Sequence, residues 1–526
     1  MIFMPSPIAN ILKKTTSLAG ATLASRVMGF LREILMAHVL GGGAVGSAWN
    51  FAIMIPNLFR RVFGEGLLGP VLVPLITQRI EKDGRDSARN QFSTIFMWMS
   101  LILCVSSIVV SGISLLVQPF VEQEHKLLAC RLIPLVVPYC IFICLIGMAT
   151  SALNSLRVFF LPAVVSLLLN ICMIGALLFL CPLFTDQPFR MLASLGYAVL
   201  LSGILELILM LVLLKVHRFP LSFTWSNFRR ISDLKEVWCL MLPGLFGAVS
   251  YQFSVLADET IALWISPYAN SALGYSNRLI YLPIGVFAVA FGTVSLPEMA
   301  QMAQHRDYRS LIETQFSSMR YLLFLTVPLM SFFALFHEDL IRLFFFRGAF
   351  DETAVRESAW ALLCYSCGIP AFAALKITLT GFYSRKEMKI PMLVGVSCNI
   401  LNLILNLILM FPMRQGGLAL STAICAYVNN IVLLFILNRQ IGGVPLKETA
   451  GHFLLLAVLT LPGLYPAWRI YHWVNGLTGA GRGFALIPAM SAAVIVYAAV
   501  YLLFAVVLKL DEVKILTRRF SRRKGA

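Results

Sequence analysis

Among the basic residues inside the apolar stretches of this sequence, where a charge is costly, six form a set of interest. A charged side chain at the centre of a bilayer costs at least ~2.5–3.5 kcal/mol, so it usually faces a partner or a water-filled cavity. Each one taken alone can also be a structural ion pair or a side chain that reaches the membrane surface. Because the guanidinium of arginine fits two oxygens of one phosphate, the set together predicts a cationic cavity for a phosphate-bearing anion. Its members are Arg26, Arg32, Arg60, Arg61, Arg278 and Lys376.

The spacing of the first two arginines constrains how they could meet one ligand. Arg26 and Arg32 are six residues apart, which places them ~120° apart around a straight helix. They can converge only if the helix bends, and Gly29 between them offers a bend point.

Acidic residues lie in the same apolar stretches. Arg61 and Glu65 are four residues apart and can neutralise each other on a helix, whereas Arg60 has no acid at that spacing and is the freer cation. Glu206 and Glu298 stand near the ends of their stretches, where a carboxylate can reach the surface. The other acidic candidates are Glu33, Asp258 and Glu259.

The sequence offers no enzymatic or metal-binding motif. The pattern Gly64-x-Gly66-x-x-Gly69 fits a dinucleotide fingerprint, but it stands in an apolar helical stretch rather than after a strand, so the glycines more simply permit close helix packing. The histidines are isolated, without metal-ligand spacing. We therefore predict no catalytic residue, no metal and no enzymatic activity.

The composition shows what must position these charges. The chain has 526 residues, of which 59% are hydrophobic and 13% are charged, and its mean hydropathy is +0.84. A soluble protein carries roughly 25% charged residues, so a water-soluble enzyme is excluded. Alternation with period two is absent, which excludes a transmembrane β-barrel. The 11 cysteines are odd in number, which excludes a complete disulfide framework.

The remaining class is an all-α polytopic membrane protein. At about 20 apolar residues per span, we predict fourteen transmembrane helices. Lys and Arg concentrate in alternate connecting segments and in the C-terminal stretch from Lys514 to Lys524, which predicts that both termini are cytoplasmic. The net charge of +17 then reflects membrane topology, and no nucleic-acid partner is expected. The predicted spans are 17–40, 46–76, 91–117, 127–150, 158–182, 190–214, 236–265, 271–300, 316–336, 355–382, 388–411, 416–438, 450–472 and 484–508.

The fifth and eleventh spans begin alike. Ser155, Pro162 and Asn170-Ile171 recur as Ser384, Pro391 and Asn399-Ile400, each 229 residues later. Because six spans separate the two copies, both run in the same direction. The repeat predicts two parallel six-helix lobes, an architecture of transporters whose substrate site lies between the halves.

Four motifs together resemble the MurJ (MviN) family of bacterial lipid II flippases. They are Ser25-Arg-Val-Met-Gly-Phe-Leu-Arg-Glu33, Pro56-Asn-Leu-Phe-Arg-Arg61 with Glu65-Gly66, Tyr275-Ser-Asn-Arg-Leu279 and Gly381-Phe-Tyr-Ser-Arg385. The resemblance implies the multidrug/oligosaccharidyl-lipid/polysaccharide exporter fold and places the chain in the bacterial cytoplasmic membrane. It also implies four segments: an N-terminal lobe over 1–220, a C-terminal lobe over 221–445, two helices over 446–510 with a groove for the lipid tail, and a basic cytoplasmic tail over 511–526.

The resemblance also assigns roles to residues. The arginines that would bind the diphosphate of lipid II fall on Arg26, Arg32, Arg60 and Arg278, and a lysine of the same cavity falls on Lys376. Glu33 and Glu65 take the acidic positions of the motifs. A cation site found in some relatives would fall on Asp258, Asn402, Asn406 and Thr422. Three residues depart from the family's usual Asp, namely Ser47, Asn277 and Asn406; the last weakens the expectation of a cation site.

The expected mechanism is alternating access, with lipid II moved from the cytoplasmic to the outer leaflet. We expect no cofactor. A coupling ion (Na⁺, H⁺ or Cl⁻) is not specified by the sequence, and the expected partners beyond lipid II are membrane lipids and cell-wall synthesis proteins. Alternatives are an exporter of another polyprenyl-linked saccharide, a multidrug exporter, a membrane-embedded polyprenyl-diphosphate enzyme and a non-transporting scaffold. A drug exporter would need acids in the cavity, and the enzyme would need an Asp or His cluster that the sequence does not offer.

Overall fold

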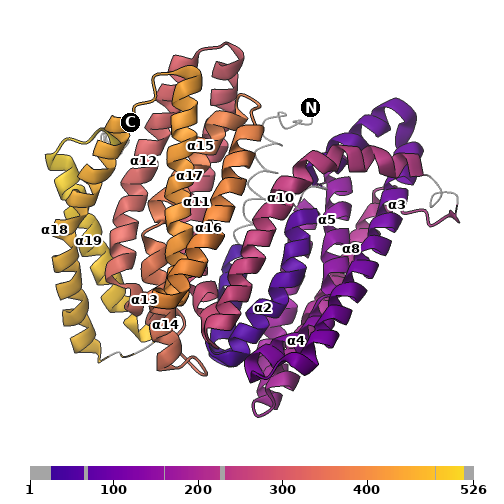
Figure 1. Cartoon of the computed structure of the whole chain (residues 1–526), viewed down its shortest axis with the longest axis horizontal. Coiled ribbons are helices and arrows are strands. Elements are labelled where there is room, and N and C mark those ends of the chain that lie inside the picture. Colours follow the sequence, from indigo (N-terminus) through magenta and orange to yellow (C-terminus); the bar gives the residue numbers. More distant parts are fainter. Residues whose placement is uncertain are drawn as a thin grey trace, which may run out of the picture. The chain divides into compact units, whose positions relative to one another are not determined.

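The computed structural model describes residues 25–63, 69–158, 160–225, 231–479, 481 and 483–513. These residues form helices joined by short connections, with no strand among them, which confirms the all-α class (Figure 1). Each predicted span falls at least partly on described helix. Within the described residues, eight helices are long and apolar enough to cross a membrane, and the number rises to ten if each of two bent helix pairs forms one span. The number fourteen stays a prediction.

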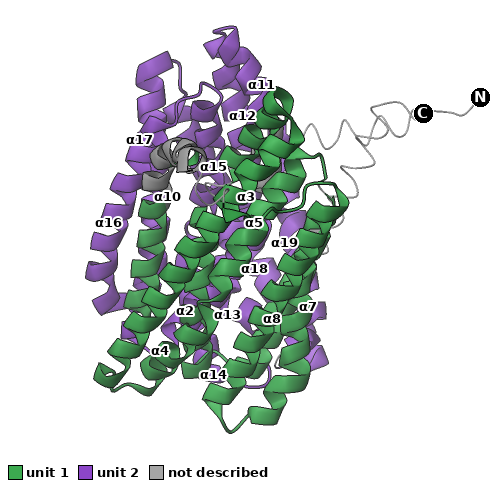
Figure 2. Cartoon of the chain, turned by 90° about the vertical axis from the view of Figure 1, so that its right-hand side faces the viewer, with its two compact units in different colours: residues 1–263 green, residues 264–526 purple. Residues whose placement is uncertain are grey.

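The chain forms two compact units, Met1–Leu263 and Trp264–Ala526, shown in green and purple in Figure 2. In the first unit, a helix over residues 25–40 is followed by α2 (Ala44–Phe59), α3 (Gly69–Val117), α4 (Glu124–Val136), α5 (Tyr139–Ser155), α6 (Phe160–Val165), α7 (Leu167–Gly175), α8 (Pro188–Val216) and α10 (Ile231–Ile265). The second contains α11 (Ala269–Gln304), α12 (Tyr308–Leu335), α13 (His337–Phe344), α14 (Glu352–Ser366), α15 (Ile369–Tyr383), α16 (Lys389–Met413), α17 (Gln415–Ile441), α18 (Leu446–Thr478) and α19 (Ile487–Val507).

The division of the units falls near the end of α10. His125 at the start of α4 contacts the carbonyl oxygen of Leu263 at 3.2 Å, and Leu263 packs in the same apolar cluster as residues of α4 and α8. The helix α10 therefore packs with the helices that precede it. The lobe boundary at 220/221 stays a prediction. The basic tail also stays a prediction, because residues 514–526 lie outside the described part of the chain.

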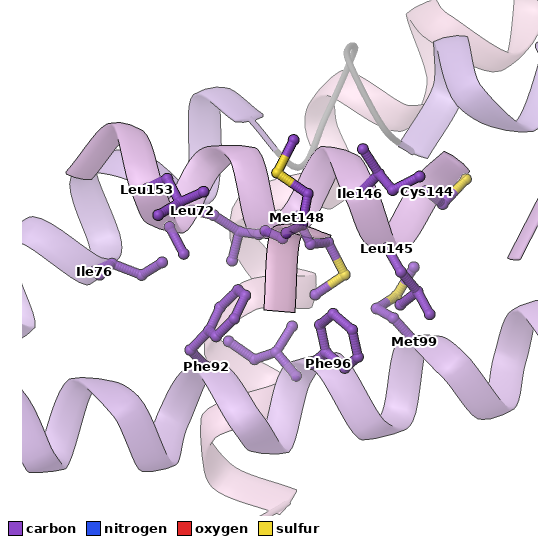
Figure 3. Close-up of a cluster of buried hydrophobic side chains, with 14 of the residues drawn as sticks. Leu72, Ile76, Phe92, Phe96, Met99, Cys144, Leu145, Ile146, Met148 and Leu153 are labelled. Carbon is purple, nitrogen blue, oxygen red and sulfur yellow. The ribbon is translucent and has the colours of Figure 1, made fainter. Parts of the chain in front are cut away.

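Apolar residues hold the first unit together. Figure 3 shows one cluster, in which Phe92, Phe96 and Met99 of α3 pack against Leu145 and Met148 of α5. These α3 residues recur at three- and four-residue intervals, so they lie on one helix face. The packing fixes α5, the helix that presents Tyr139 to the charged residues described below.

Two bends repeat along the chain. The helix pair α4 and α5 is bent by 46° at residues 137–138, and the pair α14 and α15 by 44° at residues 367–368, 230 residues further on. Pro138 precedes the first α5 residue and Pro370 is the second residue of α15, so each bend lies beside a proline that cannot continue the backbone ladder. This separation differs by one residue from the 229-residue repeat of the sequence, so the repeat extends to these helix pairs.

The last helix, α19, bonds to α12 through two tyrosines. Pro328 in α12 lacks the N–H that would bond to the carbonyl oxygen of Phe324. The buried hydroxyl of Tyr501 donates to that oxygen at 2.9 Å, and Tyr497 donates to the oxygen of Pro328 at 3.1 Å. Lipid offers no other donor to the carbonyl oxygen of Phe324. Leaving such a group without a partner inside a membrane would cost several kcal/mol of stability, and the bond from Tyr501 avoids that cost.

Candidate functional site

Arg32 lies at the centre of a hydrogen-bonded group in the first unit. Its Nη2 donates to Oε1 of Glu33 at 2.7 Å, in an ion pair whose side chains are 21% and 6% exposed. Its Nη1 donates to Oδ1 of Asn170 at 3.1 Å and lies 3.7 Å from the sulfur of Met173. The expected cation is therefore present but is held by one carboxylate and one neutral amide.

Arg60 approaches the same region from α2. A π-helical turn over residues 60–63 follows α2, and Arg60 is its first residue. The hydroxyl of the buried Tyr139 interacts electrostatically with Arg32, Arg60 and Glu206, so the structure brings these four residues of one unit together. Glu206, which the sequence placed near a span end, is only 4% exposed and accepts a hydrogen bond from the backbone N–H of Leu169 at 2.9 Å.

The other predicted residues of the first unit are placed differently. Arg26 and Arg61 are exposed, and residues 25–40 form one continuous helix that includes Gly29. Glu65 lies outside the described residues, so the expected pair of Arg61 with Glu65 stays a prediction. Arg26 is only six residues from Arg32, but its side chain is exposed, whereas the side chain of Arg32 is mostly buried.

The second unit carries Arg278 on α11 and Lys376 on α15. The guanidinium carbon of Arg278 lies 5.7 Å from the centre of the Tyr275 ring, and the arginine is half-buried, whereas Lys376 is exposed. The rings of Tyr281 and Phe372 stack with their centres 6.2 Å apart, so the two helices lie side by side near both cations. That the four arginines and Lys376 act on one ligand stays a prediction.

Three residues of the predicted cation site form a polar cluster between α16 and α17. Nδ2 of Asn402 donates to Ser421 at 3.2 Å and to Thr422 at 3.5 Å, and Nδ2 of Asn406 donates to Oδ1 of Asn402 at 3.2 Å. Ser421 donates to Oδ1 of Asn406. The four side chains are neutral and bond to one another, so they form a complete network without an ion.

Asp258, the only carboxylate of the predicted cation site, lies on α10 and is half-buried. No group of three or more His, Cys, Asp and Glu residues suited to a metal occurs in the described ranges. A monovalent cation at these residues stays a prediction. To bind such a cation, the side-chain amide oxygens of Asn402 and Asn406 would have to turn toward the ion.

Sequence reasoning did not assign three polar residues of these clusters, of which Tyr139 is one. Asn170 was noticed as a marker of the repeat but not as the partner of Arg32, and Ser421 was not noticed. A polar residue at a repeated position inside an apolar span is the signal that could have led to Asn170. No comparable signal marks Ser421, because serine is common in membrane helices.

The comparisons with known proteins decide the family. The family model described as "Lipid II flippase MurJ" matches residues 36–494. The chain belongs to the MurJ family. A "Probable lipid II flippase MurJ" of Rhizobium tropici is 31% identical over 438 residues, which cover 82% of this chain and 81% of that protein. The "Lipid II flippase MurJ" of Burkholderia cenocepacia is 28% identical over 511 residues, which cover 94% of this chain and 96% of that protein.

Solved structures agree with the MurJ fold. One described as "Lipid II flippase MurJ, inward closed conformation" is similar with a TM-score of 0.76 and 24% identity, covering 93% of this chain and 99% of that one. An inward-facing multidrug resistance transporter of the MATE family is similar with a TM-score of 0.67 and 15% identity, covering 80% and 95%. At these identities the likeness concerns the fold alone. The resemblance to the exporter fold and to the MurJ family is thus confirmed, and the chain is a multi-pass membrane protein.

Proposed function

We propose that this chain moves lipid II from the cytoplasmic to the outer leaflet of the bacterial cytoplasmic membrane by alternating access, without chemical conversion of the lipid. The match of the MurJ family model over residues 36–494 carries this proposal. Both termini would be cytoplasmic. Membrane lipids would surround the helices, and cell-wall synthesis proteins would use the product.

The arginines would recognise the diphosphate. Arg26, Arg32, Arg60 and Arg278 would hold its oxygens, with Lys376 adding charge, because guanidinium groups bind phosphate bidentately. The electrostatic link of Arg32 and Arg60 to the buried Tyr139 supports a shared cationic region in the first unit. Glu33 and Glu65 would support the arginines rather than contact the substrate.

The lipid tail would follow the last helices. A groove of about 500 Å³ lies on the second unit between α13 and α19, with walls that are apolar except for one serine. The groove is open to its surroundings, and its apolar walls suit an alkyl chain. This supports the assignment of a lipid-facing role to the segment 446–510. The lining residues are Leu343, Phe344, Phe484, Ile487, Met490, Ser491, Val494 and Ile495.

The energy would come from the membrane rather than from a bound nucleotide. Moving negative charge outward across an inside-negative membrane is favourable by ~2.3 kcal/mol per charge per 100 mV. A coupled Na⁺, H⁺ or Cl⁻ could add to this. For Na⁺, the network of Asn402, Asn406 and Thr422 with Asp258 is the candidate site.

The test is flipping of lipid II by the purified chain in proteoliposomes. Alanine at Arg26, Arg32, Arg60 or Arg278 should abolish flipping while the protein still inserts into the membrane. Lysine at the same positions should restore part of the activity, because it keeps the charge but loses the planar fork. Wild-type activity in all four alanine variants would overturn the proposed role of the arginines. Transport of cationic drugs in place of lipid II would favour the multidrug alternative.

A further inference from the structure

The helical hydrogen-bond pattern of the fifth predicted span is interrupted at Ser166, close to the residue that contacts Arg32. The helix α6 ends at Val165 and α7 begins at Leu167, with Ser166 at the break. In transporters, broken helices commonly form substrate sites, because freed backbone groups and helix ends point into the site. Inside a membrane each freed group needs a partner.

Glu206 of α8 supplies that partner. The N–H of Leu169 belongs to the first turn of α7, where N–H groups have no partner within the helix, and Ser166 gives no side-chain cap. Oε1 of the buried Glu206 accepts this N–H at 2.9 Å. A carboxylate at a helix N-terminus is also favoured by the helix dipole. The start of α7 is thereby fixed to α8.

The next residue of α7, Asn170, holds Arg32. Asn170 is 7% exposed, and its Oδ1 accepts from Nη1 of Arg32 at 3.1 Å while Glu33 accepts from Nη2 at 2.7 Å. Two nitrogens of the guanidinium are thus held from two different helices, which fixes its plane. The Nε–H of Arg32 is buried and has no hydrogen-bond partner within the described residues.

We propose that Asn170 is a positioning residue for Arg32: its neutral amide fixes the guanidinium without adding a second negative charge to that of Glu33, so that the site does not repel a diphosphate. This inference rests on the proposed function. An aspartate at the same place would hold Arg32 as firmly, but with Glu33 it would give the arginine two carboxylates. The expected result is a correctly folded site that no longer attracts an anion.

The repeat supplies a matched control. Asn399 stands at the position equivalent to Asn170, is half-buried on α16, and makes no hydrogen bond to another described side chain. An asparagine at this position of the repeat therefore does not always accept a hydrogen bond from an arginine. Substitutions of Asn399 should leave flipping unchanged.

The test compares Asn170→Ala, Asn170→Asp, the double variant Glu33→Gln/Asn170→Asp and the control Asn399→Asp, all in the full-length chain. Thermal unfolding and flipping of lipid II in proteoliposomes are measured for each. Since a hydrogen bond to a charged group contributes ~1.5–3 kcal/mol, Asn170→Ala should slow flipping by about tenfold or more. Asn170→Asp should unfold at or above the wild-type temperature yet flip more slowly than Asn170→Ala. The double variant, with one carboxylate again beside Arg32, should recover much of the lost rate.

The outcomes separate this inference from the proposed function. Wild-type flipping rates in Asn170→Ala and Asn170→Asp, with flipping lost in Arg32→Ala, would overturn the role of Asn170 alone. Slow flipping of Asn170→Asp that the Glu33→Gln change does not relieve would also overturn it, since it would point to a packing defect. A wild-type protein that does not flip lipid II would overturn the proposed function itself.

Discussion

Replacing Arg32 with alanine should damage the protein in two separable ways. Glu33 is 5% exposed and its carboxylate accepts a hydrogen bond from Arg32 at 2.7 Å. Taking one partner from a buried ion pair costs about 3–5 kcal/mol. We expect the lower end, because Arg32 keeps 21% of its side-chain surface accessible. Against a typical total stability of about 5–15 kcal/mol, this is a large loss, and it adds to the lost contact with substrate.

The second substitution Glu33→Gln separates the two effects. In the Arg32→Ala background it removes the buried charge, so most of the lost stability should return. Flipping should not return, because the guanidinium is still missing. The assay is thermal unfolding in detergent together with lipid II flipping in proteoliposomes. The control is Arg309→Ala, which breaks an exposed pair with Glu313 at 3.2 Å and should change stability by at most about 1 kcal/mol.

Two results would refute this reasoning. If Arg32→Ala unfolds at the wild-type temperature, the ion pair with Glu33 contributes nothing and the burial argument is wrong. If the double variant regains flipping, Arg32 acts by neutralising Glu33 and not by contacting a substrate.

Three further predictions concern the scaffold. Gly203→Ala should destabilise by about 1–3 kcal/mol in thermal unfolding, because an added Cβ would lie 2.9 Å from the ring of Tyr139. Tyr501→Phe should cost about 1–3 kcal/mol, because the carbonyl oxygen of Phe324 would lose the hydroxyl that takes the place of the missing proline N–H. A hydrogen bond from the first turn of α12 lowers the pKa of Asp307, so its stabilising effect is present above the unfolded pKa and lost as pH falls through the folded pKa. Asp307→Asn should therefore flatten the fall of the unfolding temperature below about pH 4.

The first two of these predictions each have a control variant. Gly112→Ala, where an added Cβ would meet nothing within 4 Å, should not destabilise. Tyr465→Phe changes a tyrosine that is 68% exposed and should be neutral. If Gly203→Ala unfolds at the same temperature as Gly112→Ala, the packing argument is wrong. If Tyr501→Phe unfolds at the same temperature as Tyr465→Phe, the bond to Phe324 does not stabilise the protein. If the unfolding temperature of Asp307→Asn depends on pH as that of the wild-type protein does, the Asp307 cap does not contribute to the pH dependence of stability.

The sequence was informative where lipid imposes strong rules. Long apolar stretches must be helical in a membrane, so the spans could be located, and the repeat at Asn170 and Asn399 was visible without coordinates. The bends near Pro138 and Pro370 follow the same period. What hydropathy could not give was the number of true crossings, because bent pairs and connecting helices have similar composition.

The partners within the site were harder to predict. Sequence spacing suggests only pairs on one helix, such as Arg61 with Glu65, whereas Arg32 is held by Asn170 from a helix 138 residues away. Glu206 stands near a span end, so the sequence allowed both a surface position and a buried one, and the structure buries it. The break at Ser166 creates the free N–H that Glu206 binds, and a broken helix is not visible in a continuous apolar run.

The most direct test of the account is the leaflet distribution of lipid II in cells that depend on this chain for flipping. The headgroup is made accessible to a membrane-impermeant probe on the outer face before and after acute inactivation of the chain. The account predicts that the accessible pool falls while lipid II facing the cytoplasm accumulates, and that the wild-type protein reverses this but Arg32→Ala/Glu33→Gln does not. An outer pool that stays constant after inactivation would contradict it.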